Sequence, residues 1–94
     1  MAIGSFKDKS TEAVSQGAIP RGFSSEVVRA ARRKLAMLVA AGRIGDLASP
    51  PGNHLEALRG GRAGQYSIRI NEQWRICFRW VESRAEDVEI VDYH

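Results

Sequence analysis

The chain has 94 residues, 44% of them hydrophobic and 27% charged, which excludes intrinsic disorder and leaves room for one domain, residues 1–94. Fourteen basic and 11 acidic residues give a net charge of +3, and most of the basic residues are arginine, whose planar fork of donors suits phosphate. The single cysteine excludes an internal disulfide and a cysteine-based metal cluster.

The first residues predict an edge strand rather than a leader. Residues 2–7 suit a short strand, and charged side chains begin at Lys7, too early for the apolar core of a signal peptide. No later stretch stays apolar over the roughly 20 residues that a membrane span requires. We therefore expect a cytoplasmic protein without a membrane partner.

A short helix is predicted directly after this strand. Residues 8–16 suit a helix that Asp8 or Ser10 caps and that Gly17 stops. A turn is predicted at residues 20–22, where proline and glycine flank an arginine. The turn separates the first helix from a longer one.

The clearest helix is predicted at residues 24–41, with Ser24 as its cap and Gly42 as its stop. Its apolar residues recur at helical spacing and are Val27, Val28, Ala31, Leu35, Leu38 and Val39. The opposite side carries Arg29 and the basic run at residues 32–34. This run is either a solvated helix face or a contact surface for RNA or a partner protein.

The second half of the chain predicts an antiparallel sheet. A connector rich in turn residues, residues 43–53, precedes it, and the apolar period then changes from 3.6 to 2. Strands are expected at residues 54–58, 66–70, 74–80 and 88–93. They are joined by a loop at residues 59–62 and by turns near residues 71–72 and 82–86. The prediction is an α+β domain, with two N-terminal helices packed on a twisted antiparallel meander.

Alternation along the strands predicts two different sheet faces. The residues expected beneath the helices are Trp74, Ile76, Phe78 and Trp80, the two tryptophans serving only as core. Arg69, Arg75 and Arg79 then point to the other face, and Arg59 and Arg62 lie on an adjoining loop. An open face lined by arginines is either a phosphate-binding surface or an ordinary solvated sheet face.

Proton-transfer candidates lie at the C-terminus. His94 titrates in the neutral range when unperturbed, and with Asp92 and Tyr93 it forms either an acid/base group or a frayed tail. Metal chemistry is not expected, because His54 and His94 are the only histidines and the carboxylates are scattered. No phosphate-binding glycine loop or dinucleotide motif appears, so no cofactor is expected. Cys77 is expected to be a small packed side chain.

Two stretches of the chain resemble HigB-type toxins of the RelE/ParE superfamily. They are residues 55–78, LEALRGGRAGQYSIRINEQWRICF, and residues 88–94, VEIVDYH. The opening at residues 3–7 and the connector at residues 50–53 fit the same family. The resemblance implies a RelE-like microbial RNase fold that binds in the A site of the 70S ribosome and cuts mRNA there. It also implies a HigA-like helix-turn-helix antitoxin, with which the toxin represses its own operon, so that operator DNA is contacted only through the antitoxin.

The chemistry that the resemblance implies is metal-free attack of an RNA 2′-hydroxyl on the adjacent phosphorus. Arg75 matches the family's catalytic arginine in the Trp-Arg pair and is expected to stabilise the phosphorane. Tyr93 and His94 match the functional C-terminal pair, with His94 as the acid and Tyr93 stacking on a base or orienting the phosphate. Asp92 is expected to orient His94.

The base for the 2′-hydroxyl is left open between two residues. Some relatives carry a histidine where this chain has Glu56, and Glu56 is one candidate. His54 is the other, since two residues earlier on a strand it shares that face, and both can also be plain surface residues. The side chains expected to bind RNA or phosphate are Arg59, Arg62, Arg69, Arg79 and His54.

Three functions compete on the sequence. The first is the ribosome-dependent RNase toxin, favoured because Arg75, Tyr93 and His94 are present. The second is a gyrase-directed toxin as in the ParE branch, whose members typically lack those residues. The third is a non-catalytic binding module that acts only as a co-repressor with its antitoxin. A growth-arrest assay and a gyrase assay separate them.

Overall fold

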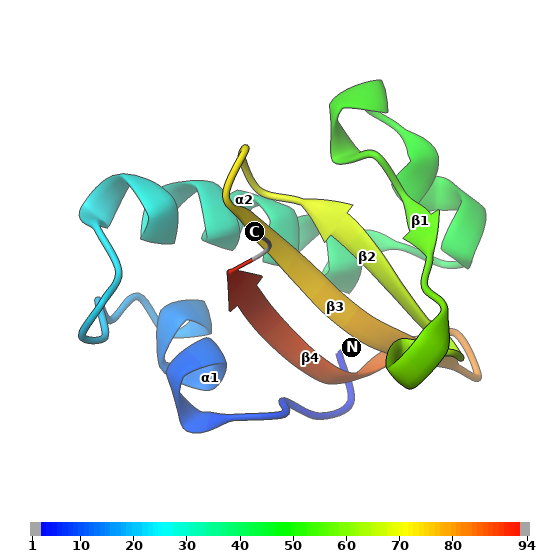
Figure 1. Cartoon of the computed structure of the whole chain (residues 1–94), viewed down its shortest axis with the longest axis horizontal. Coiled ribbons are helices and arrows are strands. Elements are labelled where there is room, and N and C mark those ends of the chain that lie inside the picture. The colour runs from blue at the N-terminus through cyan, green and yellow to red at the C-terminus, as the bar shows by residue number, and fades with distance from the viewer. Residues whose placement is uncertain (1–2, 93–94) are drawn as a thin grey trace.

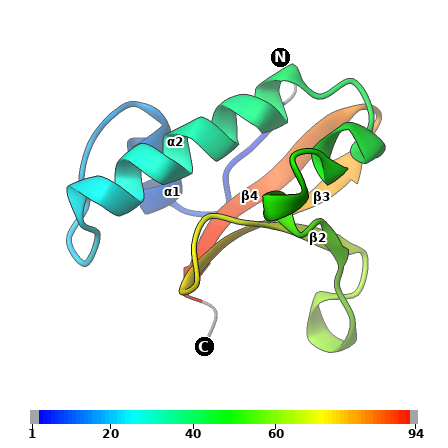
Figure 2. The ribbon, with the colours of Figure 1, turned by 90° about the horizontal axis from the view of Figure 1, so that it is seen from above.

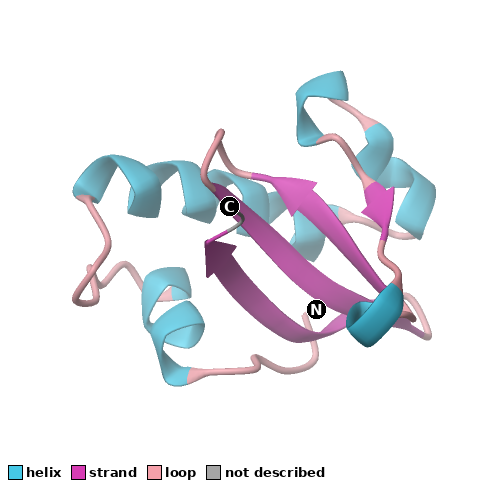
Figure 3. Cartoon of the chain, viewed as in Figure 1, coloured by secondary structure: helices cyan, strands magenta, loops and turns pink. Residues whose placement is uncertain are grey.

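The computed structural model describes residues 3–92 and shows an α+β fold with both helices against one face of a four-stranded sheet (Figures 1 and 2). The helices are α1 (Lys9–Ser15) and α2 (Ser25–Ala40). The strands are β1 (Glu56–Ala57), β2 (Gln65–Arg69), β3 (Trp74–Val81) and β4 (Arg84–Asp92). They are antiparallel in the order β1-β2-β3-β4, which confirms the predicted meander (Figure 3). No helix within residues 3–92 is long and apolar enough to cross a membrane.

Side-chain caps begin both helices where the sequence predicts. The Asp8 carboxylate accepts a hydrogen bond from the Thr11 backbone N–H at 2.7 Å, so Asp8 rather than Ser10 caps α1. The Ser24 hydroxyl accepts from the Val27 backbone N–H at 3.1 Å and caps α2. Each helix ends within a residue or two of its predicted stop.

The core lies between α2 and the sheet face that α2 covers. From α2 the buried residues are Val28, Ala31, Leu35 and Leu38. From the sheet they include Ile68, Ile76, Phe78, Val88 and Ile90. Trp74 and Trp80 pack half-buried against this cluster, as predicted. Val39 was predicted to join the core but is 44% exposed, because no element covers the side of α2 on which it lies.

The segment at residues 3–7 lies along the outer edge of β4. Ile3 and Phe6 each form an isolated parallel bridge with β4, so the predicted edge strand takes the form of two bridges. The approach is close at Gly4, where a Cβ atom would collide with the Glu86 carboxylate. The first described residues therefore complete the sheet beside its last strand (Figure 1).

Two strands differ from the prediction in length. The expected strand at residues 54–58 contracts to β1, because His54 adopts a left-handed backbone conformation with φ 47°. β4 begins at Arg84 rather than at residue 88, since the preceding turn needs only Glu82 and Ser83, both with positive φ. The register between β3 and β4 shifts by one residue near Asp87, which also has positive φ.

Three 3₁₀ turns fill the remaining segments. The predicted connector holds η1 (Ile44–Ala48) and η2 (Pro51–Asn53), and the predicted loop at residues 59–62 holds η3 (Gly60–Arg62). Both regions therefore contain the turn-rich backbone that their proline, glycine and asparagine content indicates. After the connector, β1 pairs with β2, and η2 also packs against β2.

Candidate functional site

The sheet face that turns away from the helices carries Arg69, Arg75 and Arg79, and Arg62 contacts Glu89 of β4 from η3; we call these four side chains the arginine face. The β2–β3 register places Arg69 directly opposite Arg75 and Gln65 opposite Arg79. Period-two alternation puts these side chains opposite the buried Ile68, Ile76 and Phe78, as the sequence predicts.

Arg75 is the most enclosed of these arginines and is held from two sides. Its Nε donates to the Ser67 hydroxyl at 2.9 Å, and its Nη2 donates to the His54 backbone carbonyl at 2.7 Å. A Glu56 carboxylate oxygen lies 3.8 Å from the same Nη2. The Arg75 side chain is 12% exposed while the Glu56 side chain is 57% exposed. The guanidinium is thus fixed on the open side of the sheet and does not enter the apolar core.

The carbonyl that holds Arg75 is itself positioned by a buried amide. The Asn53 side chain donates to the backbone carbonyls of Leu47 at 3.1 Å and Ser49 at 3.3 Å. Its oxygen accepts a hydrogen bond from Lys34 Nζ at 2.6 Å. Asn53 therefore ties the connector to α2, and the left-handed residue that follows it, His54, directs its carbonyl at the arginine.

Arg62 and Arg79 are each paired with a carboxylate of β4. Arg62 Nη1 lies 3.2 Å from a Glu89 oxygen and also donates to the Gln65 side chain at 3.0 Å. Arg79 Nε donates to Asp87 at 2.9 Å, in a pair whose two side chains are about half exposed. An exposed pair such as Arg79–Asp87 is weak, typically about 0–1 kcal/mol, so a phosphate group can compete for the Arg79 guanidinium.

Arg69 belongs to the arginine face, and Arg59 lies in the adjoining loop that contains η3. Arg59 is exposed at the start of η3, and Arg69 Nε donates to the Asn71 backbone carbonyl at 3.1 Å. A hollow of about 310 Å³ beside η3 is lined by Glu56, Ala57, Leu58, Arg59 and Arg62. Within residues 3–92, no group of three His, Cys, Asp or Glu residues is placed to hold a metal ion.

Cys77 lies at the centre of the arginine face but is fully buried there. Burial raises the pKa of its thiol, the Glu89 carboxylate acts in the same direction, and the charges of Arg62 and Arg75 oppose the shift. The thiol is therefore a packed neutral side chain, as expected from the sequence.

The structure brings together some predicted site residues and separates others. Glu56 is adjacent to Arg75, whereas His54 lies outside β1, so the prediction that it shares a strand face with Glu56 is wrong. His54 contributes its backbone carbonyl rather than its ring. Asp92 ends β4 and accepts a hydrogen bond from the Gln73 side chain at 3.2 Å. Tyr93 and His94 lie outside the described residues.

Ser67 is the site residue that the sequence did not single out. Alternation places it on the arginine face, but serine is common on exposed strands, and here it is fully buried under Arg75. The available signal was its place in the predicted hairpin. Ser67 pairs with Cys77, so it lies two residues from Arg69 on β2 and diagonally across from Arg75 on β3, on the same sheet face.

Comparisons with known proteins agree on one family. Residues 4–94 match the family model described as "RelE-like toxin of type II toxin-antitoxin system HigB". "Toxin HigB-1" of Vibrio cholerae serotype O1 is 45% identical over 65 residues, which span 69% of this chain and 68% of that protein. "Endoribonuclease HigB" of Proteus vulgaris is 29% identical over 92 residues, which span 98% and 99% of the two chains.

A solved structure supports the same fold. A chain of the YoeB–YefM complex from Staphylococcus aureus superposes with a TM-score of 0.62 at 15% sequence identity, covering 100% of this chain and 99% of that one. The family model matches nearly the whole chain, including the strands that carry the arginine face. The chain therefore belongs to the HigB-like family of RelE-like toxins of type II toxin-antitoxin systems.

Proposed function

We propose that the chain is an endoribonuclease that cuts mRNA in the A site of the 70S ribosome and thereby arrests translation and growth. The observation that carries the proposal is Arg75, held by Ser67 and the His54 carbonyl on a sheet face that no helix covers. A relative that matches the whole chain is named Endoribonuclease HigB, which supports RNA cleavage as the reaction.

The reaction proposed is metal-free transesterification. The RNA 2′-hydroxyl attacks the adjacent phosphorus and loses its proton to a base, and the 5′-oxygen leaves with a proton from an acid, so that a 2′,3′-cyclic phosphate remains. Negative charge builds on the phosphorane oxygens, and the Arg75 guanidinium stabilises it. Because Arg75 is already hydrogen-bonded in place, little reorganisation is needed when that charge appears.

Glu56 is the proposed base among the described residues. Its carboxylate is exposed and lies 3.8 Å from Arg75 Nη2, so a 2′-hydroxyl next to a phosphate on Arg75 comes within its reach. His94 is the proposed acid, oriented by Asp92, with Tyr93 stacking on a base or orienting the phosphate. The remaining side chains proposed to hold RNA are Arg59, Arg62, Arg69, Arg79 and His54.

The proposed partner is a HigA-like helix-turn-helix antitoxin. The family description names these proteins as toxins of type II toxin-antitoxin systems, which supports an antitoxin as partner. We propose that it neutralises the chain, and that the complex represses its own operon through DNA contacts made by the antitoxin.

Cleavage of ribosome-bound mRNA tests the function directly. Purified 70S ribosomes programmed with a defined mRNA should yield a cut at the A-site codon when the wild-type chain is added. Arg75→Ala should lower the rate by about 10²–10³, the usual cost of removing one donor to a developing oxyanion. Arg43→Ala is the matched control, because Arg43 is an exposed arginine at the start of η1 and does not belong to the arginine face. Intact mRNA with folded wild-type protein excludes the proposed activity.

A pair of variants decides between the two candidate bases. Glu56→Gln should lower the cleavage rate by about 10²–10⁴, the typical contribution of a general base. His54→Asn removes the imidazole but keeps a residue that tolerates the left-handed backbone, so the carbonyl on Arg75 stays in place. His54→Asn should therefore lower the cleavage rate much less than Glu56→Gln, because it removes only a proposed RNA contact. The reverse ranking assigns the base to His54.

A further inference from the structure

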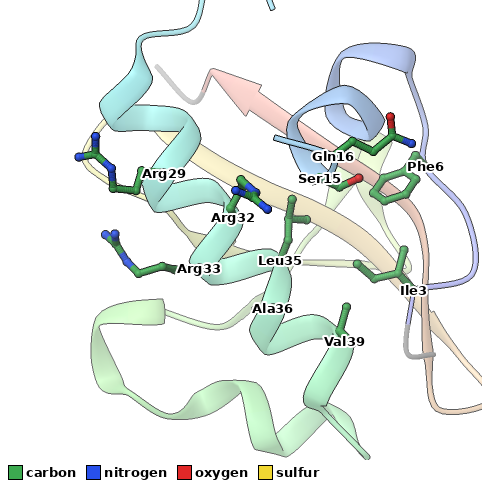
Figure 4. Close-up of a pocket in the computed structure, with 10 residues that line it drawn as sticks. All are labelled: Ile3, Phe6, Ser15, Gln16, Arg29, Arg32, Arg33, Leu35, Ala36 and Val39. Carbon is green, nitrogen blue, oxygen red and sulfur yellow. The ribbon is translucent and has the colours of Figure 1, made fainter. Parts of the chain in front are cut away.

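An open groove lies on the other side of the molecule from the arginine face, between α2, the end of α1 and the segment at residues 3–7 (Figure 4). Its volume is about 700 Å³. The apolar side chains that form its floor are Ile3, Phe6, Leu35, Ala36 and Val39. We call it the α2 groove. It shares no lining residue with the arginine face.

The floor of the α2 groove is apolar surface that the fold leaves uncovered. Val39 is 44% exposed although it lies on a helix whose neighbouring positions, Leu35 and Leu38, are buried. Figure 4 shows Val39 and Ile3 facing each other across the hollow, with Phe6 beyond them. Contiguous apolar surface rimmed by polar groups is typical of a protein-binding site.

The rim of the α2 groove is positively charged. Arg29, Arg32 and Arg33 line it from α2, all three exposed, and no carboxylate belongs to its described lining. Within residues 3–92, no ion pair joins any of these arginines to an acidic side chain. The Arg32 guanidinium reaches toward the end of α1, where a Cβ atom on Gly17 would lie 3.7 Å from its Nη1.

Apolar floor and basic rim together select a particular occupant. Apolar side chains at helical spacing fill such a groove, and carboxylates along the edges of the same segment pair with the arginines. Nucleic acid fits less well, because a phosphate backbone satisfies the arginines but leaves the apolar floor in water. A segment that is both acidic and amphipathic satisfies both parts.

We propose that the α2 groove binds an acidic amphipathic segment of the antitoxin. The proposal rests on the antitoxin partner of the proposed function and adds where and by what chemistry it docks. Docking there is independent of Arg75, which lies across the sheet. An antitoxin segment in the α2 groove also covers Val39, which is 44% exposed in the isolated chain.

The apolar part of the proposal is tested with a matched pair of surface variants. The full chain is mixed with the full-length cognate antitoxin of the proposed function, and the Kd is measured by calorimetry. Val39→Asp should weaken binding by at least about tenfold, because it places a charge on the floor against an apolar anchor. Ile19→Asp is the control: Ile19 is 55% exposed, outside the groove, and the change should leave Kd within about twofold.

The basic rim is tested by charge reversal. Arg29→Glu combined with Arg32→Glu should weaken antitoxin binding by about tenfold or more and flatten its salt dependence. The same double reversal at Arg21 and Arg43, exposed arginines outside the groove, should change neither. Circular dichroism confirms that each variant folds. Hydrogen exchange on the wild-type complex gives a readout without any variant: residues 29–39 should gain protection on antitoxin binding.

Three results overturn the proposal. One is wild-type affinity in Val39→Asp and in the Arg29/Arg32 reversal. Another is weaker association with 70S ribosomes in these variants at unchanged antitoxin affinity, which assigns the groove to RNA. The last is self-association of the chain alone that Val39→Asp abolishes at unchanged antitoxin affinity, which assigns it to a second copy. Each readout is independent of RNA cleavage, so a chain that binds antitoxin in the groove but leaves mRNA intact refutes only the nuclease.

Discussion

Two groups that do no chemistry themselves decide where the Arg75 guanidinium lies. The Ser67 hydroxyl accepts from Nε and the His54 carbonyl accepts from Nη2, so both edges of the planar fork are fixed. A lysine in place of Arg75 carries all its donors on one nitrogen, so it cannot reproduce the two contacts that Nε and Nη2 make from separate positions. The position of the positive charge therefore depends on Ser67 and His54 as well as on Arg75.

Ser67→Ala tests this positioning role. Loss of the hydroxyl should lower the rate of mRNA cleavage by about tenfold, equivalent to roughly 1.4 kcal/mol, because Arg75 keeps its charge but loses one of its anchors. The affinity for mRNA-programmed ribosomes should change little, so the loss should appear in the rate constant of cleavage. Ser83→Ala, at an exposed turn position, is the control. A loss of ribosome binding equal to the loss of rate contradicts a positioning role.

The arginines themselves were predictable, and their partners were not. Period-two alternation in β2 and β3 places Arg69, Arg75 and Arg79 on one face without any knowledge of the fold. The His54 carbonyl that accepts from Arg75 belongs to a residue with a backbone φ of 47°, and residue patterns do not encode that angle.

The connector between α2 and β1 acts as one unit because Asn53 joins its turns. The side chain is completely buried, with hydrogen bonds to two carbonyls of the connector and to Lys34 on α2. A buried polar group held this way fixes one arrangement of the surrounding backbone. That arrangement includes the carbonyl that contacts Arg75.

Asn53→Ala should destabilise the protein and reduce its activity together. Two carbonyls lose their donor in a buried site, so the free energy of unfolding should fall by about 1–3 kcal/mol. Urea unfolding measures the loss, and the cleavage assay should show a further drop at concentrations where the variant is fully folded. Asn71→Ala is the comparison: its side chain also accepts backbone hydrogen bonds, from Gln73 and Trp74, but in the β2–β3 turn outside the connector. A stable variant with unchanged cleavage contradicts the link between connector and site.

Helices were predicted more closely than strands, for a physical reason. α2 has a cap, a 3.6-residue period and a stop, all of them local signals. The ends of β1 and β4 depend instead on which distant backbone groups are available as partners, on the left-handed His54 and on the shifted register near Asp87. The exposure of Val39 is likewise decided by segments far away in the sequence.

At the scale of the whole molecule, the segment at residues 3–7 protects the outer edge of β4. Gly4 and Lys7 donate backbone hydrogen bonds to β4, at 2.8 and 2.9 Å, and Ser5 accepts one at 3.0 Å. Without them β4 presents unpaired backbone groups to solvent, and such an edge pairs readily with another chain.

A variant that begins at Asp8 should therefore be less stable and should self-associate. It loses the three backbone hydrogen bonds and exposes the edge of β4, while the cap of α1 is retained. Thermal unfolding and sedimentation measure the two effects. A double alanine variant at Lys7 and Lys9 is the control, because it removes charge and leaves the backbone pairing intact. A monomeric variant of unchanged stability contradicts the protective role.

Pairing between the beginning and the end of the described chain also sets an order of events during synthesis. Ser5 contacts Glu86 and Asp87, and Thr11 accepts from the backbone of Ile90, so these contacts join residues about 80 positions apart. A nascent chain cannot close its sheet until β4 has emerged, since β4 lies between β3 and the opening segment. Arg75 and its anchors precede β4 in translation, yet the sheet that supports them is complete only afterwards. The proposed cleavage activity is therefore expected only after β4 has been synthesised and has closed the sheet.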